Sequence, residues 1–393
     1  MNETPDYSVF LAAYYKAMDP SLTQQAIGSR ANLGTQAQVS RLLAEARAKG
    51  YLREVFEFPA DMRSDDRRKL QRELELSFYD RHAELEAALA KRARELCRTR
   101  SYGGNPFKRL HVVATPSWRA GDEKARGDAF GAFGANAAEI AAGYVDEADS
   151  CSVAWGRTID ATVRRIRSRG KAPEPTKVFM PIAGEPANYE PNGVSPSDAA
   201  RILAAAWPGS EALSLRGGPA RIPKSVYEHD ETGIAREMAR YSRNYRRIFN
   251  RSGGLIENVA MILTGIGDVT TSKRTGEQAD PWYRETADAE DPDVLGLAVG
   301  NIGGVWIARN GLTGPDAKKV EQVNERWLGA QHDDFRRCSL NGGEAGRPGV
   351  VALAVEPEKA AIVLEALYLI NVLVVSRQLA DTLAAELLGQ NQG

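Results

Sequence analysis

Apolar residues near the N-terminus recur at helical intervals. The first group predicts a helix over residues 7–18 and comprises Tyr7, Phe10, Leu11, Tyr14, Tyr15 and Met18. Two short amphipathic segments follow between Leu22 and Lys49, and Asn32-Leu33-Gly34 separates them. Gly34 suits the left-handed residue of a tight turn, Thr35 is a good N-cap for the second segment, and Gly50 is a good stop. The pattern therefore predicts two further helices joined by a tight turn.

These two segments have complementary apolar faces. Ala26, Ile27 and Leu33 of the first can pack on Val39, Leu42, Leu43 and Ala46 of the second. The packing leaves polar side chains at the start of the second helix, namely Thr35, Gln36, Gln38, Ser40 and Arg41. Glutamine can pair bidentately with adenine and arginine with guanine, so this helix start is suited to reading a major groove. Residues 51–58 then alternate like the wing of a winged helix-turn-helix, although an ordinary helical hairpin remains the alternative.

A highly charged stretch with regularly placed apolar residues follows over residues 60–100. Its apolar positions are Leu70, Leu74, Leu76, Phe78, Leu85, Leu89 and Leu96. We predict one or two long helices here, whose charges form a solvated face or whose leucines form a ridge for self-association. The Gly-Gly linker at 101–106 marks a boundary. The predicted division is a DNA-binding domain over 1–60, a helical linker over 61–106 and a third domain over 107–393.

From Leu110 onwards, short β-branched runs alternate with alanine-rich helical stretches. The predicted strands are 110–115, 152–155, 177–181, 212–215, 259–264, 295–299, 350–354 and 372–375. The predicted helices are 125–144, 159–168, 197–206, 234–250 and 358–370. This alternation predicts an α/β domain with a doubly wound, mostly parallel sheet. Ligands of such sheets bind beyond the carboxyl ends of the strands.

Three turns at such strand ends have groups suited to an anion. The candidates are Gly156, Arg157 and Thr158 in the first turn, Gly267, Lys273 and Arg274 in and after the second, and Lys359 in the third. A glycine allows close backbone approach, and free amides at a helix start favour negative charge. A lysine in the first turn of a helix opposes the helix dipole unless an anion is near. Ordinary capped turns and a solvent-exposed lysine are the alternatives.

The net charge, the cysteines and the apolar stretches limit the class of protein. A net charge of −1 argues against a protein that coats nucleic acid through bulk charge, but not against a small local reader. Three scattered cysteines without histidines at metal spacing predict free thiols in a reducing compartment, with no metal and no cofactor. The first residues do not resemble a signal peptide, and Glu365 and Asn371 interrupt the longest apolar stretch. We therefore expect a cytoplasmic protein without a membrane contact.

The segment LTQQAIGSRANLGTQAQVSRLLAEARAKGYL resembles the N-terminal DNA-binding domain of the SorC family of sugar-responsive bacterial transcription regulators. Later blocks resemble that family's effector domain in the same order: SVAWGRTIDATV, VFMPIAGEP, NGVSPSDAARILA, NVAMILTGIGDV, the glycine-rich hairpin LGLAVGNIGGVWIARNG, and VVALAVEPEKAAIVLEALYLINVLVVSRQLADTLA. The resemblance implies a winged helix-turn-helix followed by an effector-binding domain. That domain is related in fold to sugar-phosphate isomerases and glucosamine-6-phosphate deaminases, and it senses phosphorylated sugars.

The resemblance also implies roles for individual residues. Gly156, Arg157 and Thr158 would hold a phosphate, and Lys359 would be a second anion contact. Asn301 stands where the family usually has an acidic residue that binds sugar hydroxyls, and Val355-Glu356 replaces a usual Gly-Gly. A carboxylate beside a phosphate would cost about 1 kcal/mol or more at a solvated site. We therefore expect Glu356 to point away, or the anion to be a carboxylate paired only with Lys359 and Arg157.

The chain is thus expected to be a transcription regulator that binds operator DNA and a phosphorylated sugar or similar anionic metabolite. A homodimer or homotetramer is expected, because one winged helix-turn-helix buries too little surface for tight specific binding. The alternatives are an isomerase- or deaminase-like enzyme and a ligand-binding module without DNA recognition. Against the enzyme, no histidine falls at the three turns.

Overall fold

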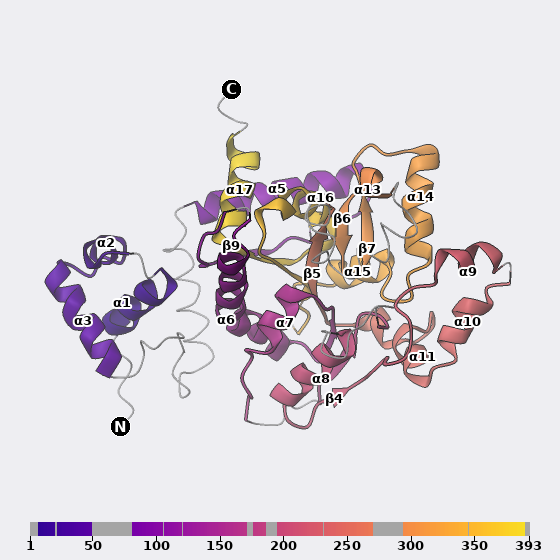
Figure 1. The fold of residues 1–393 in the computed structure, drawn as a ribbon, viewed down its shortest axis with the longest axis horizontal. Helices are drawn as coiled ribbons and strands as arrows, with labels where there is room; N and C mark the ends of the chain where they lie inside the picture. Colours follow the sequence, from indigo (N-terminus) through magenta and orange to yellow (C-terminus); the bar gives the residue numbers. More distant parts are fainter. Residues whose placement is uncertain are drawn as a thin grey trace.

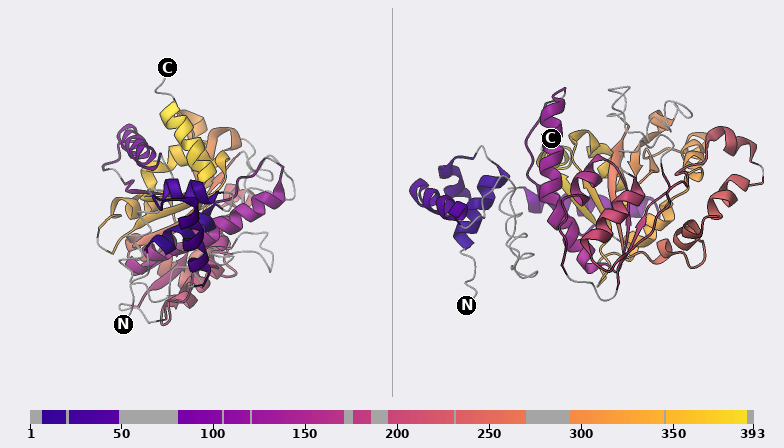
Figure 2. Two further views of the ribbon diagram at one scale, coloured as in Figure 1. Left: turned by 90° about the vertical axis from the view of Figure 1, so that its left-hand side faces the viewer. Right: turned by 60° about the horizontal axis from the view of Figure 1, so that its bottom comes forward.

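The computed structural model describes residues 7–19, 22–48, 81–104, 106–119, 121–170, 176–185, 195–230, 232–269, 294–344 and 346–389. The predicted wing, Lys273, Arg274 and the predicted ridge residues from Leu70 to Phe78 lie outside these ranges. Three N-terminal helices form a unit at one end of the molecule (Figures 1 and 2), namely α1 (Tyr7–Met18), α2 (Gln24–Arg30) and α3 (Gln36–Ala48). The three predicted N-terminal helices are therefore confirmed.

The N-terminal unit has its own small core. Its buried side chains include Phe10, Leu11, Tyr15, Ile27, Val39 and Leu43, and Ala114 from the α/β domain joins them. Thr23 caps α2 by accepting a hydrogen bond from the Ala26 amide at 3.2 Å. Gly34 has a φ of 85° in the turn between α2 and α3, which confirms the predicted left-handed position.

The predicted doubly wound sheet is confirmed. Within the described residues, seven parallel strands follow the order β1-β9-β8-β5-β2-β3-β4. Their bounds are β1 (Arg109–Val113), β2 (Ser150–Val153), β3 (Val178–Pro181), β4 (Glu211–Ala212), β5 (Met261–Asp268), β8 (Gly349–Ala354) and β9 (Val372–Ser376). An antiparallel hairpin of β6 (Ala298–Ile302) and β7 (Val305–Ala308) pairs with the last residues of β5.

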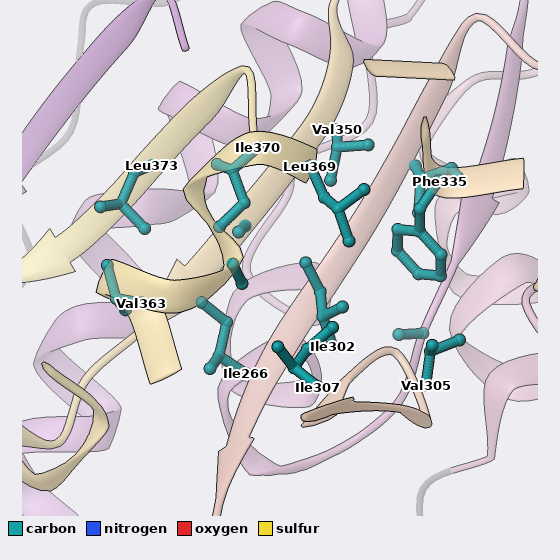
Figure 3. Close-up of a cluster of buried hydrophobic side chains, with 14 of the residues drawn as sticks. Ile266, Ile302, Val305, Ile307, Phe335, Val350, Val363, Leu369, Ile370 and Leu373 are labelled. Atoms are coloured by element: carbon teal, nitrogen blue, oxygen red, sulfur yellow. The ribbon is translucent and has the colours of Figure 1, made fainter. Parts of the chain in front are cut away.

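Helices cover both faces of the sheet (Figure 1). One face holds α6 (Glu123–Glu147), α7 (Arg157–Val163) and α8 (Pro196–Ala206). The other holds α5 (His82–Thr99), α15 (His332–Leu340), α16 (Ala360–Ala366) and α17 (Arg377–Leu388). Successive strand residues serve opposite faces, since Val372 and Val374 of β9 join the first core and Leu373 and Val375 the second. Figure 3 shows the second core, where Phe335, Val363 and Leu369 converge with Val350 and Ile302.

The remaining elements refine several predictions. They are α9 (Lys224–His229), α10 (Ile234–Arg240), α11 (Arg243–Phe249), η1 (Leu255–Asn258), α13 (Val294–Leu297), α14 (Gly314–Glu325), η4 (Pro357–Lys359) and η5 (Leu367–Leu369). The single helix predicted over 234–250 is wrong, because Ser242 caps a new helix by accepting from the Tyr245 amide at 3.4 Å. The strand predicted over 295–299 begins only at Ala298, after the helical turn of α13. The helix predicted over 358–370 is α16 between two 3-10 turns.

The described part of the predicted linker helix belongs to the α/β core. Leu85, Leu89 and Leu96 of α5 are buried in the same cluster as residues of α16 and α17. Arg92 of α5 also forms an ion pair with Glu365 of α16 at 2.7 Å. These three leucines are therefore neither part of a solvated face nor available as a ridge for self-association, which corrects the prediction for this stretch.

Asn371 links four segments at the start of β9. Its side-chain amide donates to the carbonyls of Pro106 and Ser339, both at 2.9 Å, and its Oδ1 accepts from the Val350 amide at 2.8 Å. The residue is fully buried. Gly349 leaves it room, because a Cβ there would lie 2.2 Å from Asn371 Oδ1.

No helix in the described ranges combines the length and the apolar composition needed to cross a membrane.

Candidate functional site

A hollow opens at the point where the sheet changes its direction of winding. From β2 the chain continues outward to β3 and β4, and it then returns to place β5 on the other side of β2. A crevice at the carboxyl ends of these two neighbouring strands is the usual consequence of such a reversal of strand order. The hollow lies there, and the β6–β7 hairpin and the turn after β8 complete its wall.

The hollow gathers the predicted effector residues that the structure describes. Its lining includes Gly156, Arg157, Thr158, Gly267, Asn301 and Lys359. Their convergence is a consequence of the parallel sheet, since the carboxyl ends of β2, β5 and β8 meet at one edge. Gly156 has a φ of 117°, so glycine is the residue that this turn accepts without strain. The structure therefore brings the first and third predicted turns together, without testing what they bind. The second prediction is wrong for Gly267, which lies inside β5 and not in a turn, because its backbone pairs with Asn301 of β6.

Aromatic side chains form part of the wall. Trp155, directly after β2, lines the hollow and stacks on Trp327 with ring centroids 5.9 Å apart and planes at 24°. Phe130 of α6 lies on the other side, beneath the guanidinium of Arg157 at 5.0 Å from its ring centroid. These aromatic residues were not predicted as part of the site, because nothing in the local sequence distinguishes them from core residues.

Glu356 lies in the hollow, and three cationic side chains surround it. Its Oε2 accepts a hydrogen bond from Lys359 Nζ at 2.8 Å. Its Oε1 pairs with Arg157 Nη2 at 3.4 Å and with Arg126 Nη2 at shorter range. The expectation that Glu356 points away is therefore wrong. The physical reason is that a lysine and an arginine largely buried at this edge are stabilised by a carboxylate, which Glu356 provides.

The electrostatics of this cluster favour the ionised carboxylate. Burial alone would raise the pKa of Glu356, but the charges of Lys359 and Arg157 and the hydrogen bonds from Lys359 and Arg126 outweigh it and lower the pKa to about 2. Burial alone would likewise lower the pKa of Arg126, yet its hydrogen bond to Glu356 and the charge of that residue raise it. Glu356 is thus ionised throughout the physiological range.

Arg126 is a site residue that the sequence did not reveal. It lies in the first turns of α6 and also pairs with Glu123 at 3.2 Å, an ordinary i, i+3 contact on a helix surface. Only the fold brings it to Glu356, 230 residues away in the chain. No sequence signal marked it.

Two polar side chains face the hollow beside the hairpin. Asp268 ends β5, and Asn301 lies opposite Gly267 in the β5–β6 register. A Cβ at Gly267 would lie 2.6 Å from Asn301 Nδ2, so glycine makes room for the amide. The Gly304 amide donates to Asn301 Oδ1 at 3.3 Å. Within the described ranges, no cluster of three or more histidine, cysteine or acidic side chains could hold a metal ion.

The predicted DNA-contacting residues all lie on the surface of the N-terminal unit. Exposed side chains are found at Thr35, Gln36, Gln38, Ser40 and Arg41. Gln38 also caps the start of α3. Its Oε1 accepts a hydrogen bond from the Thr35 amide at 2.7 Å, and Thr35 Oγ1 accepts one from the Gln38 amide at 3.4 Å. This reciprocal arrangement is a capping box. Bidentate pairing with adenine needs the same Oε1, so Gln38 is less suited to base reading than Gln36.

The two parts of the chain together define a known class of fold, a helical N-terminal unit followed by a doubly wound α/β domain. The full-length sorbitol operon regulator SorC from Klebsiella pneumoniae has this fold, with a TM-score of 0.55 and 18% identity over 97% of this chain and 99% of that one. The probable sor operon regulator from Shigella flexneri gives 0.54 and 18% over 77% and 98%. A domain of a possible sugar-binding transcriptional regulator from Arthrobacter aurescens TC1 gives 0.51 and 18% over 78% and 98%.

These likenesses confirm, for the fold, the resemblance to the SorC family found in the sequence. No family profile and no curated protein matches the chain by sequence.

Proposed function

We propose that the chain is a transcription regulator whose N-terminal unit binds operator DNA and whose α/β domain binds a small sugar-like effector. The observation that carries this proposal is that the likeness to full-length SorC extends over both parts of the chain. A fold alone does not specify function, so the two sites must supply the chemistry.

Each site supports its part of the proposal. The first turns of α3 present exposed hydroxyl, amide and guanidinium groups, which are the groups that read base edges. The hollow combines an aromatic wall with a few convergent polar groups, which is the usual composition of a small-molecule site.

The alternative of a proton-transferring enzyme has no support from the described residues. His82 binds the Leu110 carbonyl at 2.9 Å, His111 the Tyr144 hydroxyl at 2.7 Å, and His332 the Tyr368 hydroxyl at 3.0 Å. None of them, nor His229, is among the described residues that line the hollow. The alternative of a module without DNA recognition is separated from a regulator by a DNA-binding measurement.

We also propose that the regulator acts as a homodimer or homotetramer. A single module of this size buries too little surface for tight specific binding at physiological salt. Light scattering of the full chain should therefore return two or four copies at the concentration that saturates DNA. A monomer with full affinity would contradict this expectation.

Replacing Arg41 by alanine should weaken specific binding by roughly 1–3 kcal/mol and relax the preference at one base pair. Arg41 is exposed at the start of α3, where a guanidinium can pair bidentately with guanine. The measurement is a titration of a DNA site that the full chain itself selects from a random pool. Arg98→Ala is the matched control, since it removes one exposed positive charge from α5. An equal loss on selected and random DNA would make Arg41 a phosphate contact only.

A further inference from the structure

The anion position of the hollow already holds an anion. The two oxygens of Glu356 divide the surrounding donors between them, Oε2 taking Lys359 and Oε1 taking Arg126 and Arg157. We propose that Glu356 is a built-in substitute for a ligand phosphate, so that the effector is an uncharged sugar or polyol. This inference rests on the proposed function and names the chemical class of its effector.

The carboxylate of Glu356 and its partner Lys359 are largely buried. The side chain of Glu356 is 3% exposed, that of Lys359 is 9% exposed and that of Arg126 is 16% exposed, whereas that of Arg157 is 55% exposed at the mouth of the cluster. A phosphate could reach Lys359 only by displacing Glu356 or by lying beside it. Either change is unfavourable, because the first leaves a carboxylate without its partners and the second places two anions together at a site shielded from water.

The charges of the residues that line the hollow are balanced without a ligand. Among the described residues that line the hollow, the charged ones are Arg157, Lys359, Asp268 and Glu356, so their formal charges cancel. A neutral ligand keeps this balance, whereas a phosphate ester would disturb it.

The remaining wall suits a hydroxylated molecule. Asp268 and Asn301 offer carboxylate and amide groups that can bind hydroxyls. Trp155, held flat by Trp327, offers an apolar surface for the carbon-bound hydrogens of a sugar. Glu356 therefore provides the discrimination against phosphate, and Asp268, Asn301 and Trp155 provide the affinity for a polyol.

The test uses the variant Glu356→Gln in the full chain, with inorganic phosphate as the probe. The amide keeps the shape of the side chain but removes the carboxylate that pairs with Lys359, Arg157 and Arg126, of which Arg126 still has Glu123. We expect the melting temperature of the variant to fall and millimolar phosphate to raise it again, whereas phosphate leaves the parent unchanged. Calorimetry should show phosphate binding at least about tenfold tighter to the variant than to the parent.

A matched control separates this site from a general effect of anions. Glu365→Gln also removes a mostly buried carboxylate from an arginine, since Glu365 pairs with Arg92 at 2.7 Å outside the hollow. Phosphate should not restore its melting temperature preferentially. Equal rescue of both variants, or no gain of phosphate binding by Glu356→Gln, would overturn the inference.

The parent protein provides a second measurement that does not depend on the folding of any variant. Phosphate and sorbitol 6-phosphate are titrated against it, with sorbitol as the uncharged comparison. Saturable binding of either phosphate at least as tight as that of sorbitol overturns the inference, and its absence supports the inference. Failure of the proposed function is distinct from both results, since it would appear as the absence of a selected DNA site.

Discussion

Replacing Gly28 by alanine is expected to weaken specific DNA binding strongly while the α/β domain stays folded. A Cβ at Gly28 would lie 2.4 Å from the backbone oxygen of Gly34, so α2 or the turn must shift. Overpacking of this kind costs about 1–3 kcal/mol, which is large for the small core of three helices. The shift also displaces the start of α3, where Gln36 and Arg41 lie, and affinity for the selected site should fall by at least about tenfold.

The control for this prediction is Gly143→Ala in α6. Both glycines are helical, but a Cβ at Gly143 meets no atom within 4 Å. Alanine should therefore be neutral there or stabilise the helix by up to about 1 kcal/mol. If Gly28→Ala binds the selected site as the parent does, the contact between α2 and the turn is not what positions α3.

Replacing Asn371 by alanine should lower the free energy of unfolding by about 3 kcal/mol, roughly one for each of its side-chain hydrogen bonds. The change removes their partner from the Val350 amide and from the Pro106 and Ser339 carbonyls. These groups would stay buried without it. A domain of this size should lose roughly 5–10 °C in melting temperature.

Two further variants sharpen this prediction. Asn371→Asp keeps the acceptor for Val350 but turns a carboxylate oxygen towards two carbonyl oxygens, so it should be at least as destabilising as alanine. Asn310→Ala removes an exposed amide and should change stability by less than about 0.5 kcal/mol. An aspartate variant as stable as the parent would show that water or a side-chain rotation replaces the two donated bonds.

The fold could be predicted from the sequence because its signals are local and repeated. Helical spacing placed α1 correctly, and Gly34 with Thr35 placed the turn before α3. Alternation of β-branched runs and alanine-rich stretches gave the doubly wound sheet. The predicted helix bounds were wrong where a side chain hydrogen-bonds to the nearby backbone. At Ser242 such a capping hydrogen bond starts a new helix inside an otherwise continuous helical pattern.

The candidate site was predictable only in part. Patterns at strand ends located the turns at Gly156 and Lys359, and parallel topology dictates that such turns meet, whereas Gly267 proved to lie inside β5. The partners of Glu356 were not predictable, because Arg126 comes from a helix on one face of the sheet and Lys359 from a turn after β8. Glu356 was expected to point away because a carboxylate beside a phosphate is unfavourable, and the sequence does not show that three cationic side chains would surround this carboxylate. The same limit applies to the leucines of α5, whose spacing reveals a buried face but not the surface that buries it.

Helix α6 connects the hollow with the N-terminal unit through one rigid rod. Phe130 in its first turns lines the hollow, Arg126 one turn earlier pairs with Glu356, and Asn136 further along donates to the Ala114 carbonyl at 2.8 Å. Ala114 in turn belongs to the same buried cluster as Phe10 and Leu11 of α1. Ten residues of helix separate Arg126 from Asn136, a distance of about 15 Å. A ligand that tilted the first turns of α6 would therefore also shift Ala114, and with it the core of the N-terminal unit, without any unfolding of the helix between them.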